Sequence, residues 1–405
     1  MKLTILVGQC FGILPVLGAS HVDTTKLRFT FCSGRCVYAI INIIGQGLMF
    51  ILCVLKLFKE TDSLLASNTS VVFFSSNCLT GILFLRLARI WPKLSQFVAK
   101  TEAADPNLDK TLVRNCNISC ILILSMAFLE HFLSDVSSIA IAIDCQPETN
   151  VYDAFIYQSF PWVWTFVPYS PVMGFLVIFI NITCTFNWNF ADVFVICVSL
   201  YLTSRLQQIN YRINAVRGKQ TPSSFWRTMR EDYSRVSHLV KKIDDAVSGI
   251  VFLSFVNNLF FICLQLLHTL EEGVKQTPGC YSKLDERPMH GYEQAVYFIY
   301  SFSFLLVRSL AVSLIASRIH TASRAVAPVL YDVPSDCYCI EVQRFLHHIH
   351  GDTIALTGLQ FFNVKRGLVL TIAGTIVTYE LVLMQFTGVT PTAAPTSSTT
   401  LQSSA

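Results

Sequence analysis

Seven apolar windows follow one another along the chain, each bounded by charged or turn-forming residues. About 20 mostly apolar residues are enough to cross a bilayer as a helix, and every window reaches that length. The third and fourth windows are longer than a bilayer requires, so we expect them to tilt or to extend beyond it. The pattern predicts an all-α membrane protein with seven transmembrane helices, at about 34–57, 71–91, 118–143, 171–203, 248–270, 294–317 and 367–387.

The last window carries a series of polar side chains. An acid and an amide are costly where a helix faces only lipid, so such residues are expected to face water or other helices. Two interpretations follow: the helix lines a pore, or its polar groups form hydrogen bonds within a passive bundle. The polar residues are Thr371, Thr375, Thr378, Tyr379, Glu380 and Gln385.

The composition agrees with a membrane protein. Of the 405 residues, 53% are hydrophobic and 14% are charged, whereas a soluble domain has about 25% charged residues. The sequence has no basic run interleaved with aromatic residues, so we expect no nucleic-acid partner. Membrane lipid is the expected surrounding.

The distribution of Lys and Arg predicts the orientation. With a cytosolic N-terminus, 21 of these residues fall in cytosolic segments and 4 in extracellular segments, a strong bias of the kind seen in oriented membrane proteins. An odd number of spans then places the C-terminus outside the cell. This orientation in the membrane is opposite to that of a G-protein-coupled receptor. A heptahelical chemoreceptor that signals through a cytosolic partner remains an alternative.

The segments outside the spans have different characters. Residues 1–33 are expected to form an ordered cytosolic segment, because Gly8, Gln9, Gly12 and Pro15 interrupt the apolar run that a secretory signal would need. A bundle of six helices spans 34–317 and includes a long cytosolic extension at 204–247. Residues 318–366 form a cytosolic anchor region, 367–387 the last helix, and 388–405 a Thr/Ser-rich tail that should be disordered outside the cell.

Within the anchor region, residues 340–362 have the apolar spacing of one amphipathic helix. Such a helix, leading into the last span, could join subunits below the membrane or could pack on its own chain. On the outer side, the loop 144–170 is rich in aromatic residues and could be a lid over a site or an interfacial belt.

Few motifs point to chemistry or covalent modification. Cys145 and Cys280 are the cysteines of the outer segments and could pair there, and Asn68 is the sequon on that side. The cysteines at 337 and 339 and the histidines at 347–350 do not have the spacing of a zinc site. We therefore expect no metal, no cofactor and no catalytic residues, and the chain is not expected to be an enzyme.

Polar residues recur at comparable depth in four of the spans. Carboxylates, amides and hydroxyls near aromatic rings suit a polyhydroxylated ligand such as a sugar, whose C–H face can stack on Trp or Tyr. Alternatively these residues satisfy one another; Asp192 and Arg308, for example, could simply form an ion pair. The residues predicted to contact a sugar are Glu130, His131, Trp188, Asn189, Asp192, Asn258, Gln265, Tyr297 and Ser301.

The stretch Thr378-Tyr379-x5-Gln385-Phe386 resembles the C-terminal signature of insect gustatory receptors. The surrounding 373–383, with Glu380 after the tyrosine, is similar to the sugar-receptor branch. Other stretches agree and extend the resemblance over nearly the whole chain: Phe11 to Val16, Glu130-His131, Asn187 to Phe190 with Asp192, Asn257 to Gln265, and Glu341 to Phe345.

This resemblance implies a ligand-gated, non-selective cation channel in the plasma membrane of taste neurons. It implies a tetramer of identical or related subunits, in which the last helix of each subunit lines a central pore. The pore and gate residues would be Thr378, Tyr379, Glu380, Gln385 and Phe386, where an apolar ring excludes ions by dewetting. The residues leave the preferred sugar, the ion selectivity, and homomeric or heteromeric assembly open.

Overall fold

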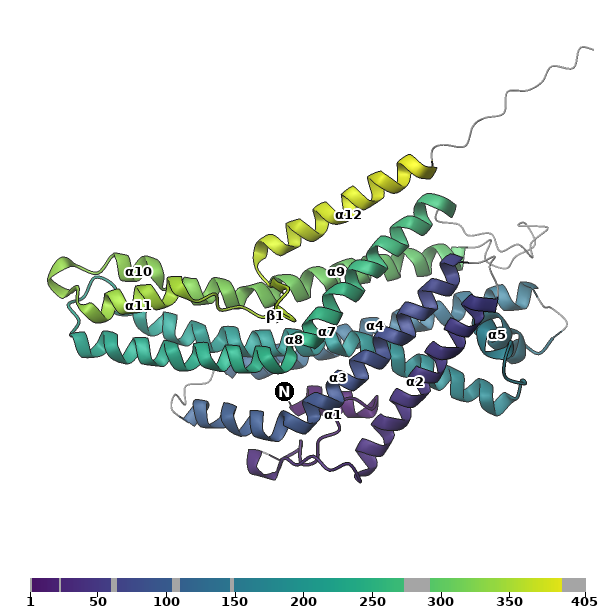
Figure 1. The fold of residues 1–405 in the computed structure, drawn as a ribbon, viewed down its shortest axis with the longest axis horizontal. Coiled ribbons are helices and arrows are strands. Elements are labelled where there is room, and N and C mark those ends of the chain that lie inside the picture. The colour runs from purple at the N-terminus through teal and green to yellow at the C-terminus, as the bar shows by residue number, and fades with distance from the viewer. Residues whose placement is uncertain are drawn as a thin grey trace, which may run out of the picture.

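The computed structural model describes residues 2–21, 23–59, 64–103, 110–145, 149–272 and 292–387, and most of them are helical (Figure 1). Each of the seven predicted windows lies within a separate helix. These helices are α2 (Gly34–Lys59), α3 (Leu64–Ala103), α4 (Lys110–Cys145), α7 (Pro171–Asn214), α8 (Ser223–Glu272), α9 (Tyr292–Arg324) and α12 (Arg366–Thr387). In the described part of the chain, six are long and apolar enough to cross a membrane, and α12 adds a shorter apolar stretch, Arg366–Tyr379.

Short elements cap the two ends of this bundle. Helices α5 and α6 follow α4 at one end, and α10 and α11 follow α9 at the other (Figure 1). The short elements are α1 (Lys2–Cys10), η1 (Thr24–Lys26), α5 (Val151–Ser159), α6 (Pro161–Trp164), α10 (Ala327–Tyr331), η3 (Ser335–Cys337), α11 (Ile340–Gly351), β1 (Thr357–Gly358) and β2 (Phe362–Asn363).

The N-terminal helix α1 packs against α4 and α7. A glycine allows this close approach, because a Cβ atom on Gly8 would lie 2.5 Å from the Phe190 ring of α7. The following segment turns back with Gly12 at φ +76° and Leu14 at φ +50°, and Leu14 is fully buried. Residues 2–19 thus lie on the bundle as part of its core.

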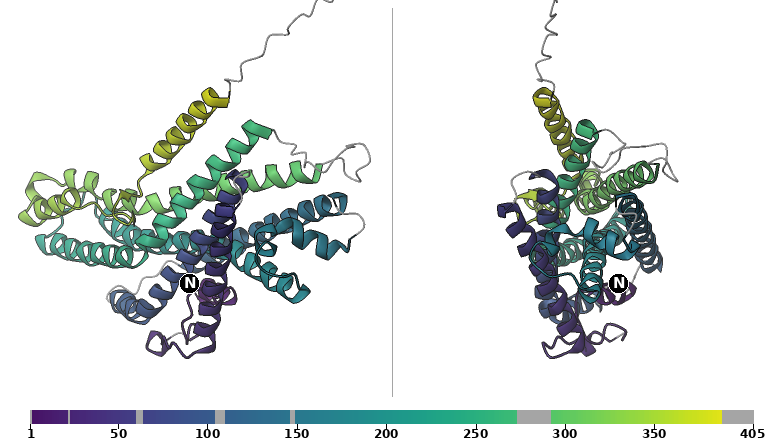
Figure 2. Two further views of the ribbon diagram at one scale, coloured as in Figure 1. Left: turned by 45° about the vertical axis from the view of Figure 1, so that its right-hand side comes forward. Right: turned by 90° about the vertical axis from the view of Figure 1, so that its right-hand side faces the viewer.

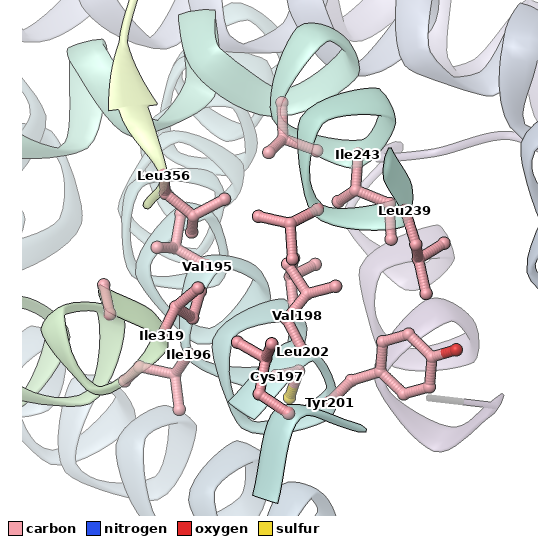
Figure 3. Close-up of a cluster of buried hydrophobic side chains, with 14 of the residues drawn as sticks. Val195, Ile196, Cys197, Val198, Tyr201, Leu202, Leu239, Ile243, Ile319 and Leu356 are labelled. Carbon is pink, nitrogen blue, oxygen red and sulfur yellow. The ribbon is translucent and has the colours of Figure 1, made fainter. Parts of the chain in front are cut away.

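The central core lies where α7 is surrounded by α4, α8, α9 and the segment after α11. Figure 3 shows Val195, Ile196 and Leu202 of α7 with Leu239 of α8 and Ile319 of α9. Leu356, which precedes β1, enters the same cluster and is fully buried. The anchor region is therefore joined to the bundle by burial of apolar surface.

The prediction of one helix over 340–362 is wrong in its second half. The helix ends at Gly351, and Asp352 is extended with φ −106° and ψ 130°. The chain then forms an antiparallel hairpin in which Gly358 pairs with Phe362. Its turn residues, Leu359 and Gln360, have φ of 49° and 63°, left-handed values that no α-helix contains.

Polar contacts fasten the anchor region to α8. Arg230 Nε donates to Glu341 Oε2 at 2.8 Å, and Lys241 Nζ donates to Asp352 Oδ2 at 2.7 Å. These bonds to cations lower the pKa of both carboxyls. The two pairs are partly exposed, so each adds only modestly to stability.

A buried carboxylate holds the hairpin itself. The backbone N–H and the hydroxyl of Thr357 donate to the two carboxylate oxygens of Asp244, each at 2.7 Å. Asp244 is 8% exposed, so water does not replace these bonds when they are lost. This single side chain fixes the start of β1 on α8.

Replacing Asp244 with Ala is expected to destabilise the anchor region by roughly 1–3 kcal/mol, because two partly buried donors of Thr357 lose their acceptor. In the purified protein this should lower the midpoint of thermal unfolding by several degrees. Asp245→Ala removes the neighbouring exposed carboxylate and is the matched control, which should leave the midpoint unchanged. Equal midpoints for both variants would contradict this role of Asp244.

A candidate ligand-binding cavity

A cavity of about 540 Å³ opens among α3, α4, α7, α8 and α9, under α5 and α6. Its lining includes residues of α5 and α6, and α5 lies at the end of the bundle opposite α10 and α11 (Figure 1). Much of its wall is polar. The polar lining includes Glu130, His131, Ser134, Asp135, Asn181, Thr185, Gln265, Gln294, Tyr297 and Ser301.

The structure brings most of the residues predicted to contact a ligand into this one cavity. They come from α4, α7, α8 and α9, four helices that are distant in sequence but adjacent in the bundle. The predicted residues in the lining are Glu130, His131, Trp188, Gln265, Tyr297 and Ser301.

A chain of hydrogen bonds crosses the cavity wall from α8 to α4. Gln265 Nε2 donates to Ser301 Oγ at 3.1 Å, and Ser301 Oγ donates to Glu130 Oε1 at 2.6 Å. Ser301 is the shared member, so these bonds join α8, α9 and α4. A ligand hydroxyl that displaced one of these bonds would change how the three helices are held together.

A second polar group lies on α4 and α7. His131 Nε2 lies 3.6 Å from Asp135 Oδ2, one helical turn away. His131 Nδ1 lies 3.5 Å from the Thr185 hydroxyl. Both ring nitrogens therefore have partners, and these partners orient the imidazole in the wall.

Several buried polar atoms of lining residues have no hydrogen-bond partner among the described residues. They comprise N–H groups, an amide oxygen and a hydroxyl, so both donors and acceptors are represented. A buried group of this kind costs about 1–3 kcal/mol when it is left unpaired. The atoms are Ser159 Oγ, Trp162 Nε1, Trp188 Nε1, Gln265 Oε1 and Gln294 Nε2.

Aromatic rings form the complementary apolar wall. The centroids of Trp188 and Phe261 are 4.6 Å apart, and Phe73 meets Trp188 edge to face at 6.3 Å. Rings exposed beside hydrogen-bonding groups suit a ligand with an apolar face and polar edges. Phe73 comes from α3, a helix from which the sequence predicted no ligand contact.

The three other predicted ligand residues, Asn189, Asp192 and Asn258, are not in the lining. They lie beside the cavity around Arg308, which is 2% exposed. Arg308 Nε is 2.9 Å from Asp192 Oδ2, and Arg308 also donates to the side-chain oxygens of Asn189 and Asn258. The ion pair that the sequence offered as an alternative is thus formed.

This buried network still meets the cavity through one ring. The Arg308 guanidinium lies 4.6 Å from the centroid of the Trp188 ring, which is within the range of a cation–π interaction. Ser254 of α8 also donates to Asp192. The network therefore supports the wall residue Trp188 and joins α7, α8 and α9.

The aromatic loop contributes to the cavity, which the sequence left undecided. Phe155 of α5, Trp162 of α6 and Phe160 between the two helices are in the lining. Tyr157, Trp164 and Tyr169 instead pack against one another in tilted and edge-to-face pairs, with the centroids of the two tyrosine rings 4.7 Å apart. One subset of the loop covers the cavity, and the sequence signal for it was the density of aromatic residues alone.

Helix α12 stands apart from this cavity. Leu368, Ile372 and Ile376 pack on the bundle, and the hydroxyl of Thr378 donates to the Gly374 carbonyl of its own helix. Tyr379 is 42% exposed. The backbones of Glu380, Gln385 and Phe386 belong to α12, but their side chains lie outside the described part of the chain.

Three further sequence features have partial answers. Cys145 takes part in a disulfide bond, while Cys280 lies outside the described residues. Asn68 lies in α3, but its side chain is also outside them. Within the described residues, no three His, Cys, Asp or Glu side chains gather in a group that could hold a metal ion.

Comparison with solved structures places the fold. The chain superposes on the insect olfactory receptor OR5 from Machilis hrabei, solved alone and in complex with eugenol, each with a TM-score of 0.67. In both cases 95% of this chain and 97% of the receptor are covered, at 14% identity for the receptor alone and 13% for the complex. This likeness identifies the architecture.

Comparison of sequences identifies the family. The model of the trehalose receptor family matches residues 1–393. Two similar proteins of Drosophila melanogaster are the gustatory receptor for sugar taste 64f, at 35% identity, and the gustatory receptor 5a for trehalose, at 31%. Each alignment covers 94% of this chain, with 79% and 83% of the relative. The chain therefore belongs to the trehalose receptor family of gustatory receptors.

Proposed function

We propose that this chain is a subunit of a sugar-gated, non-selective cation channel that serves sweet taste in the plasma membrane of chemosensory neurons. The observation that carries the proposal is the set of unpaired donors and acceptors on the residues that line the 540 Å³ cavity. A sugar supplies hydroxyls for these atoms and a C–H face for the aromatic wall. The protein acts by binding and opening, without catalysis.

The sugar, a mono- or disaccharide, would contact Glu130, His131, Gln265, Tyr297 and Ser301 by hydrogen bonds and Trp188 by stacking. Asn189, Asp192 and Asn258 would act on the sugar through Arg308, which lies over Trp188. Because the Gln265–Ser301–Glu130 bonds join three helices, sugar that exchanges with them changes the packing of α8 and α9. Phe155 and Trp162, which cover the cavity, would close over the bound sugar.

We place the N-terminus in the cytosol and the C-terminus outside, with α12 as the seventh span. The cavity then opens to the extracellular half of the bundle, where a dissolved sugar can enter. Residues 318–366 become a cytosolic anchor, in agreement with the cations at that end. Lipid surrounds the outer faces of α2 and α4, which present apolar side chains such as Leu48, Phe128 and Phe132.

Four copies of α12 would form the central pore. This helix packs one stripe on α8 and α9 and leaves apolar side chains such as Leu370 and Val377 exposed, at 77% and 58%. Figure 1 and Figure 2 both draw α12 leaning away from the bundle. Other subunits, identical or related, would cover this surface, and Gln385 and Phe386 would form the gate near its outer end.

One apolar cluster links the cavity to this helix. Phe261 and Leu305 line the cavity and belong to a cluster with Ile262. Ile376 of α12 packs against that same cluster. A sugar that is bound more tightly when α8 and α9 have shifted would therefore move α12 through direct contact, and would open the pore by its preference for that state.

Replacing Gln265 with Leu is expected to raise the half-activating sugar concentration about tenfold, which corresponds to ~1.4 kcal/mol. The variant removes the donor to Ser301 and an acceptor of the cavity wall. The half-activating concentration would be measured from the currents of oocytes given a panel of sugars. Gln343→Leu, on an exposed position of α11, is the control; a shift equal to that control at normal surface expression would remove Gln265 from the site.

Replacing Phe386 with Ala is expected to raise the resting cation conductance, because the apolar ring that excludes water from the closed pore becomes wider. Whole-cell leak current without sugar is the measurement. Val382→Ala, one turn earlier on α12, is the matched control for helix stability. An unchanged leak in Phe386→Ala with normal surface expression would argue against the gate assignment.

Sugar applied to excised, cell-free patches is expected to evoke rapid currents, because binding and conduction belong to one protein. The patch separates this proposal from a heptahelical chemoreceptor that signals through a cytosolic partner. Currents that disappear on excision and return with cytosolic extract would favour the partner.

A further inference from the structure

A second cavity, of about 330 Å³, lies on the side of the bundle where α1 packs. It is bounded by α1, the segment that follows it, α3, α4, α7 and α8, and it shares no lining residue with the first cavity. Val198 and Tyr201 of α7 and Ile243 of α8, all labelled in Figure 3, form one wall. The second cavity is thus separate from the candidate sugar site.

The second cavity is apolar over most of its wall. Leu94 and Val98 of α3, Leu112 of α4 and Val247 of α8 contribute aliphatic surface. A volume of 330 Å³ is near the lower limit of the ~300–1,000 Å³ typical of ligand cavities. These dimensions suit one alkyl chain better than the two chains of a phospholipid.

The polar groups of this cavity include one cation, Lys2, that no described acid pairs with. Lys2 and His21 are exposed lining residues, and Lys2 forms no ion pair with an acid that the structure describes. Glu102 also lines the cavity, but its carboxylate lies 3.4 Å from the Arg205 guanidinium and is thereby neutralised. Lysine ammonium groups attract anions.

One buried hydroxyl adds a second observation. Tyr201 is 9% exposed, and its hydroxyl lies beside the Glu102–Arg205 ion pair without a hydrogen bond of normal geometry to the described residues. Figure 3 shows this oxygen pointing away from the aliphatic cluster. A ligand with a polar head would supply the missing partner for this hydroxyl or lie beside it.

We propose that the second cavity binds a fatty-acid anion, with its alkyl chain between α3, α4 and α7 and its carboxylate near Lys2 and His21. The occupant would fill space between α1 and the bundle and so stabilise the packing of the N-terminal segment. The binding is independent of sugar gating.

The test is photolabelling of the purified full chain in nanodiscs of zwitterionic phospholipid, with a diazirine-bearing dodecanoic acid as the probe. We expect mass spectrometry to find the label on lining residues of α3 and α4, and dodecanoate to compete at least about tenfold better than dodecanol. Label confined to lipid-facing residues such as Ile41 and Leu48 of α2, or equal competition by both compounds, would overturn the proposal.

Variants separate the head-group contact from the chain contact. Lys2→Gln is expected to raise the half-saturating probe concentration about threefold to fivefold, while Lys26→Gln, an exposed neighbour outside the lining, leaves it unchanged. Val98→Trp should fill the cavity and abolish labelling of the lining residues, whereas Gln96→Trp, on the exposed face of α3, should not. Equal probe binding in Lys2→Gln and Lys26→Gln, or retained labelling in Val98→Trp, would contradict the proposal that this cavity binds a fatty-acid anion.

Discussion

The ion pair between Arg308 and Asp192 is the constraint on which the centre of this bundle depends. Both side chains are almost fully buried, and taking each charge out of water costs several kcal/mol. The cost is offset only while every charged atom finds a partner, and those partners come from α7 and α8. Removing either residue would leave an uncompensated charge, so the relative positions of α7, α8 and α9 are tightly specified.

That constraint also determines how a ligand bound in the cavity could affect α12. The wall residue Trp188 lies against Arg308, and its neighbour Phe261 packs in the cluster that Ile376 of α12 joins. The buried charges and α12 are therefore both in contact with the cavity wall, the charges through Trp188 and α12 through the cluster of Phe261. A rigid polar centre with an apolar cluster beside it can turn a small change in the wall into a displacement of the neighbouring helix.

The positions of the long helices were predictable from the sequence because a bilayer-length apolar run is a strong signal that needs no tertiary information. The helix at 340–362 was mispredicted because apolar spacing continues through Leu356, although the backbone at Leu359 and Gln360 turns into a left-handed conformation. Hydrophobic periodicity records which residues are buried, and here the burial comes from a hairpin. The local hints were Gly351, where the helix ends, and Gly358 in the hairpin.

The lining of the cavity could be predicted only in part from the sequence. Polarity singled out Glu130, Gln265 and Ser301, and these three residues do line one cavity. Polarity alone does not tell which polar side chain faces the cavity and which faces a buried partner, so Asp192 and Asn258 were assigned with them. The aromatic cover from α5 and α6 depends on how a loop folds back, which no periodicity encodes.

The uncovered face of α12 has a consequence for the lifetime of the chain in the cell. An apolar helix that its own subunit covers along a single stripe gains the rest of its burial from lipid or from other subunits. If other subunits supply this burial, as proposed above, the stability of the folded chain depends on how much of those subunits the cell makes. A cell that made too little of them would then degrade this chain, so the partner chains would have to be expressed in matched amounts.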